Sequence, residues 1–504
     1  MRSDRKRPRV GYERSETENS AVSALPTPRE PSDGDARPHP SSPVSREPNT
    51  EHLRRMFSSE THGKIWGVAS KALQQVGPAL FQGDLGGYEH LILTVEQPNP
   101  PLYFPEYTRP GGTEYVYRDL DFWTSGFFPG CLYLLLERER RFKPAAFDSS
   151  VAGPHESQLE FACKWWTESL HQNAQLGTTH DLGFMIAPWA KPAWELNRDF
   201  RAFETLKRAA KTLYGRFSPE VGLIRSWDTC TTKRYSFVEP DAEYLTVIDN
   251  MMNLDLLFYV ARQTGDRAMF EAAVQHARTT RRTHVRDDAS TVHLVVLDPA
   301  TGAVRERLTN QGYADASCWS RGQAWSVAGF AETYHWTRDP SFLDTARRCA
   351  DYFLRRLPAS GVPPWDFDAA AEHGAETQPP DVSAAVIAAY GLLLIHKALG
   401  ALGQDSAYLH DALRLTEAVC GRHMNDPSTF VTRRETIEMV ERSTQVVSTL
   451  SVEMGAGDTI LNGATINNHE FAPRRWANHG LVYADYYFLL VGNKLLEMGL
   501  GGLI

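Results

Sequence analysis

The stretch Val382–Leu399 reads VSAAVIAAYGLLLIHKAL, and apolar residues occupy nearly every side of the helix that it would form. A helix that is apolar all round has to be covered by protein or by lipid. Lipid is excluded because Ser383, Tyr390, His396 and Lys397 interrupt the stretch too often for a membrane-spanning helix. The stretch therefore predicts an inner helix of a large helical core.

Helical spacing of apolar residues recurs on both sides of this stretch, and the intervening loops are rich in Gly, Pro and Asp. Alternation typical of strands is scarce. Ile248–Gln263 is also apolar nearly all round and fits an inner helix, whereas Arg267–Arg282 is apolar on one side and fits an outer helix. The other predicted helices are Gly63–Gln75, Phe122–Glu139, Gln158–Gln172, Leu182–Trp189, Phe200–Phe217, Trp319–Thr337, Ser341–Arg356, Ser406–Arg422 and Val482–Met498.

The order of these segments is helix, loop and partner helix, which is typical of stacked helical hairpins that bury their apolar sides against neighbours. Six hairpins can close into an (α/α)6 barrel with an inner and an outer ring, whereas an open array would need polar caps at both ends. We therefore predict an all-α fold, an (α/α)6 barrel over residues 56–504. Residues 1–55 are rich in Pro, Ser, Glu and Arg and poor in large apolar residues, so we predict a disordered tail there.

The composition is that of an ordinary globular protein, since 42% of the 504 residues are hydrophobic and 23% are charged. A net charge of -9 offers no basic surface for phosphates, so we expect no nucleic-acid partner, and we expect no membrane association either. The same charge repels an anionic sugar at long range, so local donors in a cleft would have to capture such a ligand. The oligomeric state cannot be predicted from the sequence.

The six cysteines are scattered without CxxC or Cys/His spacing, so we expect neither disulfides nor a metal, and no motif indicates a cofactor. The basic run Met1–Arg9 lacks the apolar segment of a secretory signal, and no Asn-x-Ser/Thr site occurs in the sequence. We therefore expect an intracellular, cytoplasmic protein. The basic run is either a nuclear targeting signal or, as is commoner, a solvated part of the tail.

Five loops that precede predicted helices combine aromatic and polar residues, and they would meet at one mouth of a barrel. Aromatic faces stack on sugar rings, while Asn, Gln, His and Arg bind hydroxyls and carboxylates, so the mixture is typical of a sugar-binding site. The loops are Phe122–Phe127, Thr179–Phe184, Arg225–Asp228, Val247–Asn253 and Asn310–Trp325.

Asp181 and Asp249 stand just before two of these helices, where an N-cap carboxylate commonly accepts hydrogen bonds from the first turn. Capping alone would explain either residue. Their surroundings, His-Asp-Leu-Gly-Phe and Ile-Asp-Asn-Met-Met-Asn, are more polar than a cap requires, and this favours a pair of catalytic carboxylates.

Other candidates have a structural interpretation beside a binding one. Arg321, between Trp319 and Trp325, could pair with a substrate carboxylate, or with Asp315 or another acid at the mouth. His293 could be structural or catalytic. Any one of the tryptophans could belong to the core instead of forming a platform for sugar rings.

At these loops the sequence resembles glycoside hydrolase family 88, the unsaturated glucuronyl hydrolases, over most of the chain from about residue 60, including Pro364–Asp366 and Tyr483–Phe488. The resemblance implies an (α/α)6 barrel that removes the unsaturated uronic acid left by polysaccharide lyases at the non-reducing end of oligosaccharides. It implies Asp249 and Asp181 as the catalytic pair. The substrate-binding residues that it implies are Trp123, His180, Phe184, Trp227, His293, Gln311, Trp319, Arg321 and Trp325.

The sequence departs from the family pattern at three positions. Asn310 stands where His often precedes Gln-Gly-Tyr, Ala289 replaces the usual Gly of an Asp-Gly-Ser-Thr run, and Ala316 replaces an Asp. These departures concern the finer contacts more than the catalytic pair.

The implied reaction is hydration of a C4=C5 bond, which is a vinyl ether because C5 carries the ring oxygen. Protonation of C4 creates an oxocarbenium-like centre at C5, water attacks it, and the resulting hemiketal collapses and releases the rest of the oligosaccharide. Asp249 would donate the proton and, once ionised, deprotonate the water. Asp181, ionised nearby, would raise the pKa of Asp249 by like-charge repulsion.

Two alternatives stay open. One is an unsaturated rhamnogalacturonyl hydrolase acting on pectin fragments, which has a related Trp-Ser-Arg-Gly-Gln-Ala-Trp segment; the other is a non-catalytic sugar-binding barrel, which would not need both aspartates. In some relatives a loop bearing Ser and Lys contacts sulfate groups. The matching segment Asn462–Asn468 lacks both residue types and predicts a preference for unsulfated or differently sulfated substrates.

Overall fold

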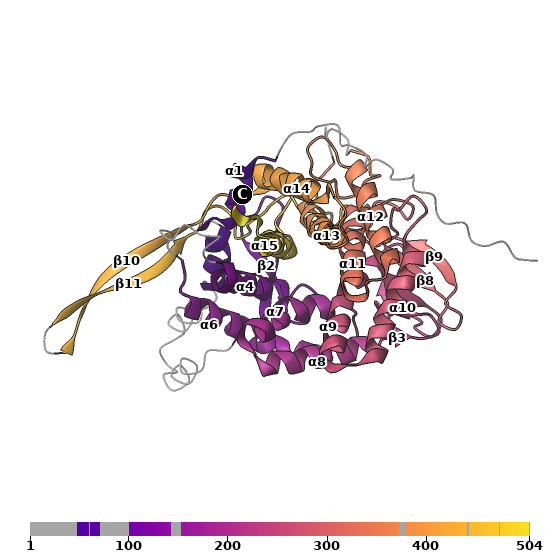
Figure 1. Cartoon of the computed structure of the whole chain (residues 1–504), viewed down its shortest axis with the longest axis horizontal. Helices are drawn as coiled ribbons and strands as arrows, with labels where there is room; N and C mark the ends of the chain where they lie inside the picture. Colours follow the sequence, from indigo (N-terminus) through magenta and orange to yellow (C-terminus); the bar gives the residue numbers. More distant parts are fainter. Residues whose placement is uncertain are drawn as a thin grey trace, which may run out of the picture. The chain divides into compact units, whose positions relative to one another are not determined.

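The fold is built on a closed ring of six inner helices, seen in a computed structural model that describes residues 48–59, 61–70, 100–142, 153–371, 378–440, 443–472 and 474–502. These residues belong to one compact unit, Ser42–Ile504. Each inner helix contacts the next, and the last contacts the first (Figure 1). The inner helices are α4 (Phe127–Glu137), α7 (Leu182–Asn197), α9 (Leu254–Thr264), α11 (Ser320–Thr337), α13 (Val382–Ala401) and α15 (Val482–Glu497).

An outer helix follows each of the first five inner helices in the chain and packs on it. The outer helices are apolar on one side only, whereas α11 and α13 are buried on nearly all sides, as the sequence predicts for an inner ring. The predicted places of α9, α13 and α10 are confirmed. The outer helices are α6 (Glu156–Thr167), α8 (Phe200–Tyr214), α10 (Arg267–His284), α12 (Pro340–Arg355) and α14 (Tyr408–His423).

Helix α13 is the one helix among the described residues that is long and apolar enough to cross a membrane. In the structure, 83% of its most apolar window is buried inside the protein. Its neighbours α11, α14 and α15 cover it.

Strands make the protein mainly helical instead of all-α, so the predicted fold class needs correction. β7 (Tyr244–Val247), β8 (Leu294–Leu297) and β9 (Val304–Leu308) form an antiparallel sheet. β7 and β8 are buried throughout, so they show no polar alternation to distinguish them from helix. The two-stranded sheets are β1 (Tyr103–Thr108) with β2 (Tyr115–Asp119), β3 (Phe217–Ser218) with β4 (Leu223–Ile224), β5 (Cys230–Thr231) with β6 (Ser236–Phe237), and β10 (Thr429–Glu438) with β11 (Thr444–Glu453).

The folded part begins earlier than predicted. Helix α1 (Thr50–Arg54) packs on α14, and Leu53 and Met56 are buried in the main core, so a disordered tail reaching residue 55 is too long. Residues 1–47 of the predicted tail lie outside the described residues. The predicted helix Gly63–Gln75 is helical where it is described, over residues 61–70.

Four aromatic rings divide the interior of the barrel into two ends. Ring centroids lie 5.6 Å apart for Phe127 and Phe184, 5.2 Å for Phe184 and Trp325, 5.4 Å for Trp325 and Tyr487, and 6.2 Å for Tyr487 and Phe127. We call this closed ring of contacts the aromatic layer. Below it, a cavity of about 470 Å³ is lined by the C-terminal halves of the inner helices. Above it, the N-terminal ends of the inner helices carry the predicted site.

Candidate active site

Asp181 precedes α7 but does not cap it. Its carboxylate makes no hydrogen bond to the first turn and instead accepts one from Thr179 Oγ1 at 2.5 Å. Asn253 caps α7 from outside, because its Oδ1 accepts from the backbone N–H of Gly183 at 2.7 Å and of Phe184 at 3.3 Å. The interpretation of Asp181 as a helix cap is therefore wrong.

Asp249 lies in the first turn of a short 3-10 helix, η4 (Ile248–Asn253), between β7 and α9. The N-cap of α9 is Asn253, so Asp249 caps no α-helix either. The neighbouring sheet fixes this turn, since the N–H of Ile248 donates to the carbonyl of His293 at 3.0 Å. Both carboxylates are thus held by their backbones, and neither is used to cap a helix.

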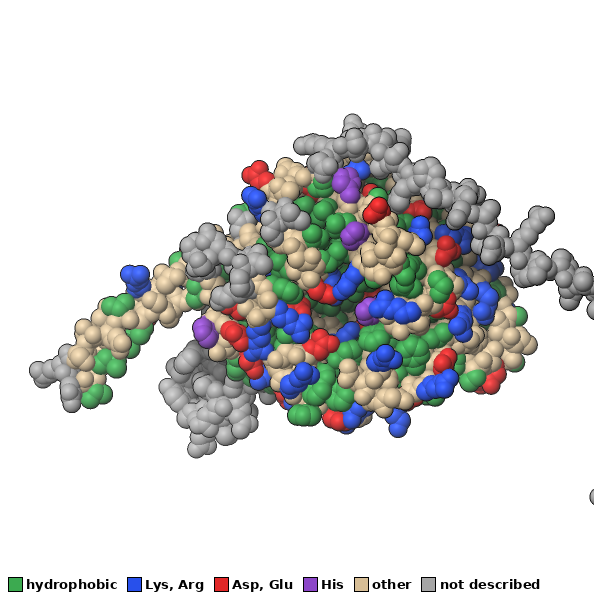
Figure 2. Space-filling view, in the orientation of Figure 1, with side chains coloured by type: hydrophobic (Ala, Val, Ile, Leu, Met, Phe, Trp, Pro, Cys, Tyr) green, Lys and Arg blue, Asp and Glu red, His purple; other side chains and the backbone are tan. Residues whose placement is uncertain are grey.

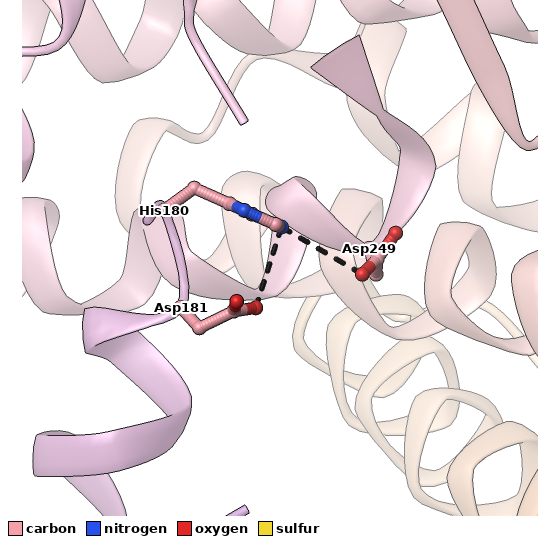
Figure 3. A group of neighbouring side chains, drawn as sticks. All are labelled: His180, Asp181 and Asp249. Atoms are coloured by element: carbon pink, nitrogen blue, oxygen red, sulfur yellow. Dashed lines mark ion pairs between the residues drawn. The ribbon is translucent and has the colours of Figure 1, made fainter. Parts of the chain in front are cut away.

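His180 lies between the two carboxylates (Figure 3). Its Nε2 is 3.4 Å from Asp181 Oδ1 and 3.7 Å from Asp249 Oδ2. Its Nδ1 is 3.1 Å from the carbonyl oxygen of Ser226, so Nδ1 carries a hydrogen and Nε2 faces the acids. His180, Asp181 and Asp249 are called the His180 group below. His180 and Asp181 are buried and Asp249 is partly buried, and the predicted proximity of the two aspartates is confirmed.

His293 faces Asp249 from the other side, with Nε2 at 3.9 Å from Oδ1. The backbone N–H of Asn310 donates to His293 Nδ1 at 2.9 Å, so Nδ1 accepts and the hydrogen is on Nε2. Burial lowers the pKa of His293 to about 4, which keeps it neutral. His293 is therefore a neutral donor aimed at Asp249.

The pKa values within the His180 group move in opposite directions. Burial raises the pKa of Asp181; the charge of His180 offsets part of this, and the charge of Asp249 adds to it. Burial would raise the pKa of Asp249 as well, but the nearby imidazole of His180 lowers it below its ordinary value. Burial lowers the pKa of His180, yet the two carboxylates outweigh burial and raise it.

Asp249 is therefore the most acidic member of this group, and His180 and Asp181 hold a proton more readily than Asp249 does. This is the reverse of the predicted effect, in which Asp181 keeps Asp249 protonated. The prediction did not include the imidazole of His180, whose Nε2 lies 3.7 Å from Asp249 Oδ2 and, when protonated, carries the opposite charge.

The His180 group is also the one set of His, Cys, Asp or Glu side chains, among the described residues, whose arrangement could hold a metal ion. Its three ligand atoms lie within 4.8 Å of one another. The same spacing suits proton exchange between neighbouring groups, which needs no ion.

The predicted aromatic platforms fall into two groups. Trp123 and Trp227 are half-buried at the mouth, and the Trp227 ring is 6.1 Å from that of His180. Phe184 and Trp325 are 3% and 1% exposed and form part of the aromatic layer at the base of the mouth. Trp319 is also buried and packs on His293 with ring centroids 4.9 Å apart.

Arg321 pairs with an acid of the protein, which was the alternative to a substrate carboxylate. Its Nη1 donates to Asp381 Oδ2 at 2.5 Å and to the carbonyl of Thr465 at 2.7 Å. Its Nη2 donates to Gln311 Oε1 at 3.0 Å and to the carbonyl of Ile466 at 2.5 Å. The acid is Asp381 and not Asp315, which pairs with Arg234 instead. Arg321 therefore positions Gln311 and the segment after Thr465.

Three buried donors at this mouth have no hydrogen-bond partner among the described residues: His293 Nε2, Trp319 Nε1 and the Tyr483 hydroxyl. The Arg321 guanidinium contacts the rings of two of these residues: it lies 4.6 Å from the ring centre of Trp319 and 5.5 Å from that of Tyr483. Unsatisfied buried donors are costly unless a ligand uses them. Tyr483 was in a quoted motif but was not among the predicted site residues.

Curated proteins similar to this chain are named unsaturated glucuronyl hydrolases and unsaturated chondroitin disaccharide hydrolases. No family model matches the chain. The chain is 30% identical over 417 residues to the unsaturated chondroitin disaccharide hydrolase of Streptococcus pneumoniae, covering 82% of this chain and 92% of that protein. It is 30% identical over 375 residues to the unsaturated glucuronyl hydrolase of Formosa agariphila, covering 73% and 78%. The chain belongs to the unsaturated glucuronyl hydrolase family.

Solved structures of unsaturated glucuronyl hydrolases share the fold. One that is specific for heparin superposes with a TM-score of 0.67 at 25% identity, over 90% of this chain and 98% of that chain. The enzyme from Bacillus sp. GL1 superposes with a TM-score of 0.65 at 24% identity, over 88% and 97%. An aspartate-to-asparagine variant of the Streptococcus agalactiae enzyme has been solved in complex with dGlcA-GalNAc6S.

The departures from the unsaturated glucuronyl hydrolase pattern lie away from the His180 group. Ala289 has φ +69°, a left-handed conformation that suits the usual Gly, and its carbonyl accepts from Gln323 Nε2 at 2.8 Å. Asn310 serves His293 through its backbone N–H, which any residue would supply. Ala316 is exposed.

Proposed function

We propose that this protein removes 4,5-unsaturated glucuronic acid from the non-reducing end of oligosaccharides that lyases cut from glycosaminoglycans. Family membership supports this activity, and so do the names of relatives that act on unsaturated glucuronyl and chondroitin disaccharide substrates. The observation that carries the proposal is the position of His180 Nε2 between Asp181 and Asp249, because a proton can then reach a reacting carbon beside either carboxylate.

The sugar carboxylate is held, in this proposal, by neutral donors and not by Arg321, whose Nη groups are already bonded to the protein. His293 Nε2, Trp319 Nε1 and the Tyr483 hydroxyl are such donors. The N-terminal ends of the inner helices meet at the same mouth and favour an anion there. Local capture of this kind overcomes the repulsion from the net charge of -9.

The proton for C4 comes from the His180 group. A bound uronate adds a negative charge and excludes water, which raises the proton affinity of Asp249. Asp249 then takes the proton from His180 Nε2, which is 3.7 Å away, and donates it to C4. The positive charge that develops at C5 lies beside two carboxylates, which stabilise it.

Water completes the reaction. Ionised Asp249 accepts a proton from the water as its oxygen bonds to C5, so one residue serves as acid and then as base. The hemiketal at C5 loses its hydroxyl proton, C5=O forms, and the bond from C5 to the ring oxygen breaks; the ring oxygen takes up a proton and leaves a hemiacetal at C1. This hemiacetal loses its hydroxyl proton, C1=O forms, the glycosidic C1–O bond breaks, and the leaving sugar takes up a proton. Asp249 passes the proton that it took from water to His180 Nε2, which restores the starting state.

The ring of six inner helices and the five outer helices support the finer assignment of an (α/α)6 barrel. In this barrel the helix of residues 61–70 would supply the sixth outer element. Its alternation of inner and outer helices along the chain is that of hairpins that close on themselves.

The test is turnover of unsaturated disaccharides from chondroitin, hyaluronan, heparin and pectin, followed by loss of the ultraviolet absorbance of the C4=C5 bond. We expect turnover of the glycosaminoglycan disaccharides. Faster turnover of the pectin-derived substrate would instead support a rhamnogalacturonyl hydrolase. Calorimetric binding of every substrate without turnover would support a non-catalytic barrel.

Two further arms define the reaction. Full activity after EDTA treatment and removal of the chelator is expected, and activity that is lost and then restored by a divalent cation would assign the His180 group to a metal.

We also propose a preference for unsulfated or differently sulfated substrates, because Asn462–Asn468 lacks Ser and Lys. A faster rate on the sulfated member of a matched pair of disaccharides would contradict that preference.

A further inference from the structure

Strands β10 and β11 form a two-stranded ribbon that extends away from the helices (Figure 1). The strands pair in an unbroken register of ten residues each, from Thr429 opposite Glu453 to Glu438 opposite Thr444. From Thr432 onward every residue of β10 is exposed. The sequence analysis did not predict this ribbon, and the proposed activity does not use it.

The base of the ribbon is fixed to the body of the protein. Lys64 is 2% exposed, and its Nζ donates to the carbonyls of Gly455, Ala456 and Gly457 at 3.2, 3.0 and 2.6 Å. The helix of residues 61–70 presents Gly67 to the side chain of Met454, at a distance that leaves no room for a Cβ. The ribbon is therefore mounted at a defined place and is not a loose loop.

The exposed part of the ribbon has unpaired strand edges and exposed hydrophobic side chains. An isolated two-stranded ribbon is at best marginally stable in water, and each outer edge carries unpaired N–H and C=O groups that can pair with another strand. Neither strand contains the Pro or Lys that commonly protects an edge. Ile437 is 39% exposed and Val446 is 61% exposed, and hydrophobic side chains run along the ribbon in Figure 2.

The sequence of β10 is complementary to itself when it is read in the opposite direction. In an antiparallel pair centred on Arg434, Val431 meets Ile437, Thr432 meets Thr436, and Arg433 meets Glu435. Each match occurs twice because of the twofold symmetry. The matched residues also share a face of the sheet, since positions that differ by an even number point to the same side.

We propose that β10 pairs with β10 of a second copy of this chain and joins the two ribbons into a four-stranded sheet. The charges select this edge, because β11 carries a single charged residue, Glu453, and offers no comparable match. Within its own ribbon Arg433 lies opposite Thr449 and Glu435 opposite Val447, so neither has an oppositely charged cross-strand neighbour, and both are exposed to a second copy. Arg434 opposes itself at the centre, which weakens the pair.

The experiment is sedimentation velocity of the full chain over a concentration series. We expect a monomer–dimer equilibrium. Arg433→Glu places like charges opposite each other twice and should weaken the dimer about tenfold. The double variant Arg433→Glu with Glu435→Arg restores both matches and should restore the dimer. Arg434→Thr removes the like-charge contact and should tighten it.

Turnover of an unsaturated disaccharide provides the control, since these residues are remote from the His180 group and all variants should keep the wild-type rate. A wild-type chain that stays monomeric at high concentration would overturn the proposal. A dimer that Arg433→Glu leaves intact, or that the charge-swapped double variant fails to restore, would overturn it as well.

Discussion

The two ends of the barrel contain the same set of charges in different surroundings. Below the aromatic layer, Lys191 lies with Asp255 and Glu332, as His180 lies with its two aspartates above it; these three residues are called the Lys191 group. Burial would raise the pKa of Asp255, but Lys191 lowers it. Burial and the charge of Asp255 raise the pKa of Glu332 to about 8. In both groups one basic side chain lies beside two acids, and the pKa of one acid is lowered while that of the other is raised.

The difference lies in the hydrogen bonds. Lys191 Nζ is 2.5 Å from Asp255 Oδ2, Trp336 Nε1 donates to Asp255 Oδ1 at 2.9 Å, and the Tyr390 hydroxyl donates to Glu332 at 2.8 Å. In the His180 group, by contrast, His180 Nε2 has no hydrogen-bond partner among the described residues; each group also leaves one acid oxygen unpartnered, Asp249 Oδ1 and Glu332 Oε2. A lysine also stays charged at neutral pH, whereas a histidine exchanges its proton there. Buried charge and an unpartnered acid oxygen occur in both groups, so a buried histidine with an exchangeable, unbonded nitrogen is the better sign of an active site.

The largest expected effect is on Asp249. Asp249→Asn removes the proposed acid and base together and should lower turnover by about a thousandfold or more, with the fold intact by circular dichroism. Asp228→Asn, an acid on a loop of the same mouth, is the matched control and should change the rate little. Wild-type turnover by Asp249→Asn would mean that the His180 group is no more catalytic than the Lys191 group.

Replacing His180 removes the exchangeable proton that distinguishes the His180 group from the Lys191 group. His180→Gln ends proton exchange between the aspartates and should lower turnover by about a hundredfold. The histidine pKa is raised by its acidic neighbours, so the wild-type rate should contain an ionisation above the ordinary histidine value. The pH–rate profile of the variant should lack it, and a profile that keeps this ionisation would assign it to another residue.

The Lys191 group should respond in stability and not in rate. Between the ordinary pKa of 4.5 and about 8, Glu332 is protonated when folded and ionised when unfolded, so stability falls as pH rises through this range. Glu332→Gln removes the penalty and should stabilise the protein by about 2 kcal/mol near pH 8, a value reduced for partial exposure, and little near pH 5. Denaturant unfolding at both pH values measures it.

Glu497 supplies the matched control for Glu332. Its pKa is lowered to about 2, because Lys494 and Lys397 offset its burial. A lowered carboxyl pKa stabilises the fold above the ordinary value, so Glu497→Gln should destabilise the protein at neutral pH, in the opposite sense to Glu332→Gln. Variants that shift in the same direction would contradict both assignments.

The smallest expected effect concerns strain near the catalytic end. Ala289 occupies a left-handed conformation at φ +69°, which costs an L-residue about 1–2 kcal/mol. Ala289→Gly removes this cost but raises the conformational entropy of the unfolded chain. The net gain in unfolding free energy should therefore be up to about 1 kcal/mol. Unchanged or lower stability would mean that burial of the Ala289 methyl group outweighs the strain.

The sequence predicted much of the helical ring and of the catalytic end. The periodicity of α13, α9 and α10 was sufficient to assign them to the inner or outer ring. The pairing of Asp181 with Asp249 followed from loop motifs, since loops before inner helices meet at one mouth. The short strands β7 and β8 were not predicted, because a short run of buried apolar residues shows neither the periodicity of a helix nor the alternation of a strand.

Other features depend on contacts between distant parts of the chain. Nothing near Asp181 indicates that Asn253 caps α7, so local propensity favoured the wrong cap. The partner of Arg321 is Asp381, sixty residues along the chain, and no local pattern distinguishes it from Asp315. The proton distribution of the His180 group required the distances from one imidazole nitrogen to two acids, and a sequence does not contain distances.

The aromatic layer affects how substrate enters the barrel and how product leaves it. Phe127, Phe184, Trp325 and Tyr487 form a closed ring of contacts between the catalytic end and the cavity below it. We therefore expect a long sugar polymer to present only its end to the proposed acid instead of passing through the barrel. The detached sugar is then expected to leave by the opening through which the next end arrives, so product release and substrate binding would be successive events.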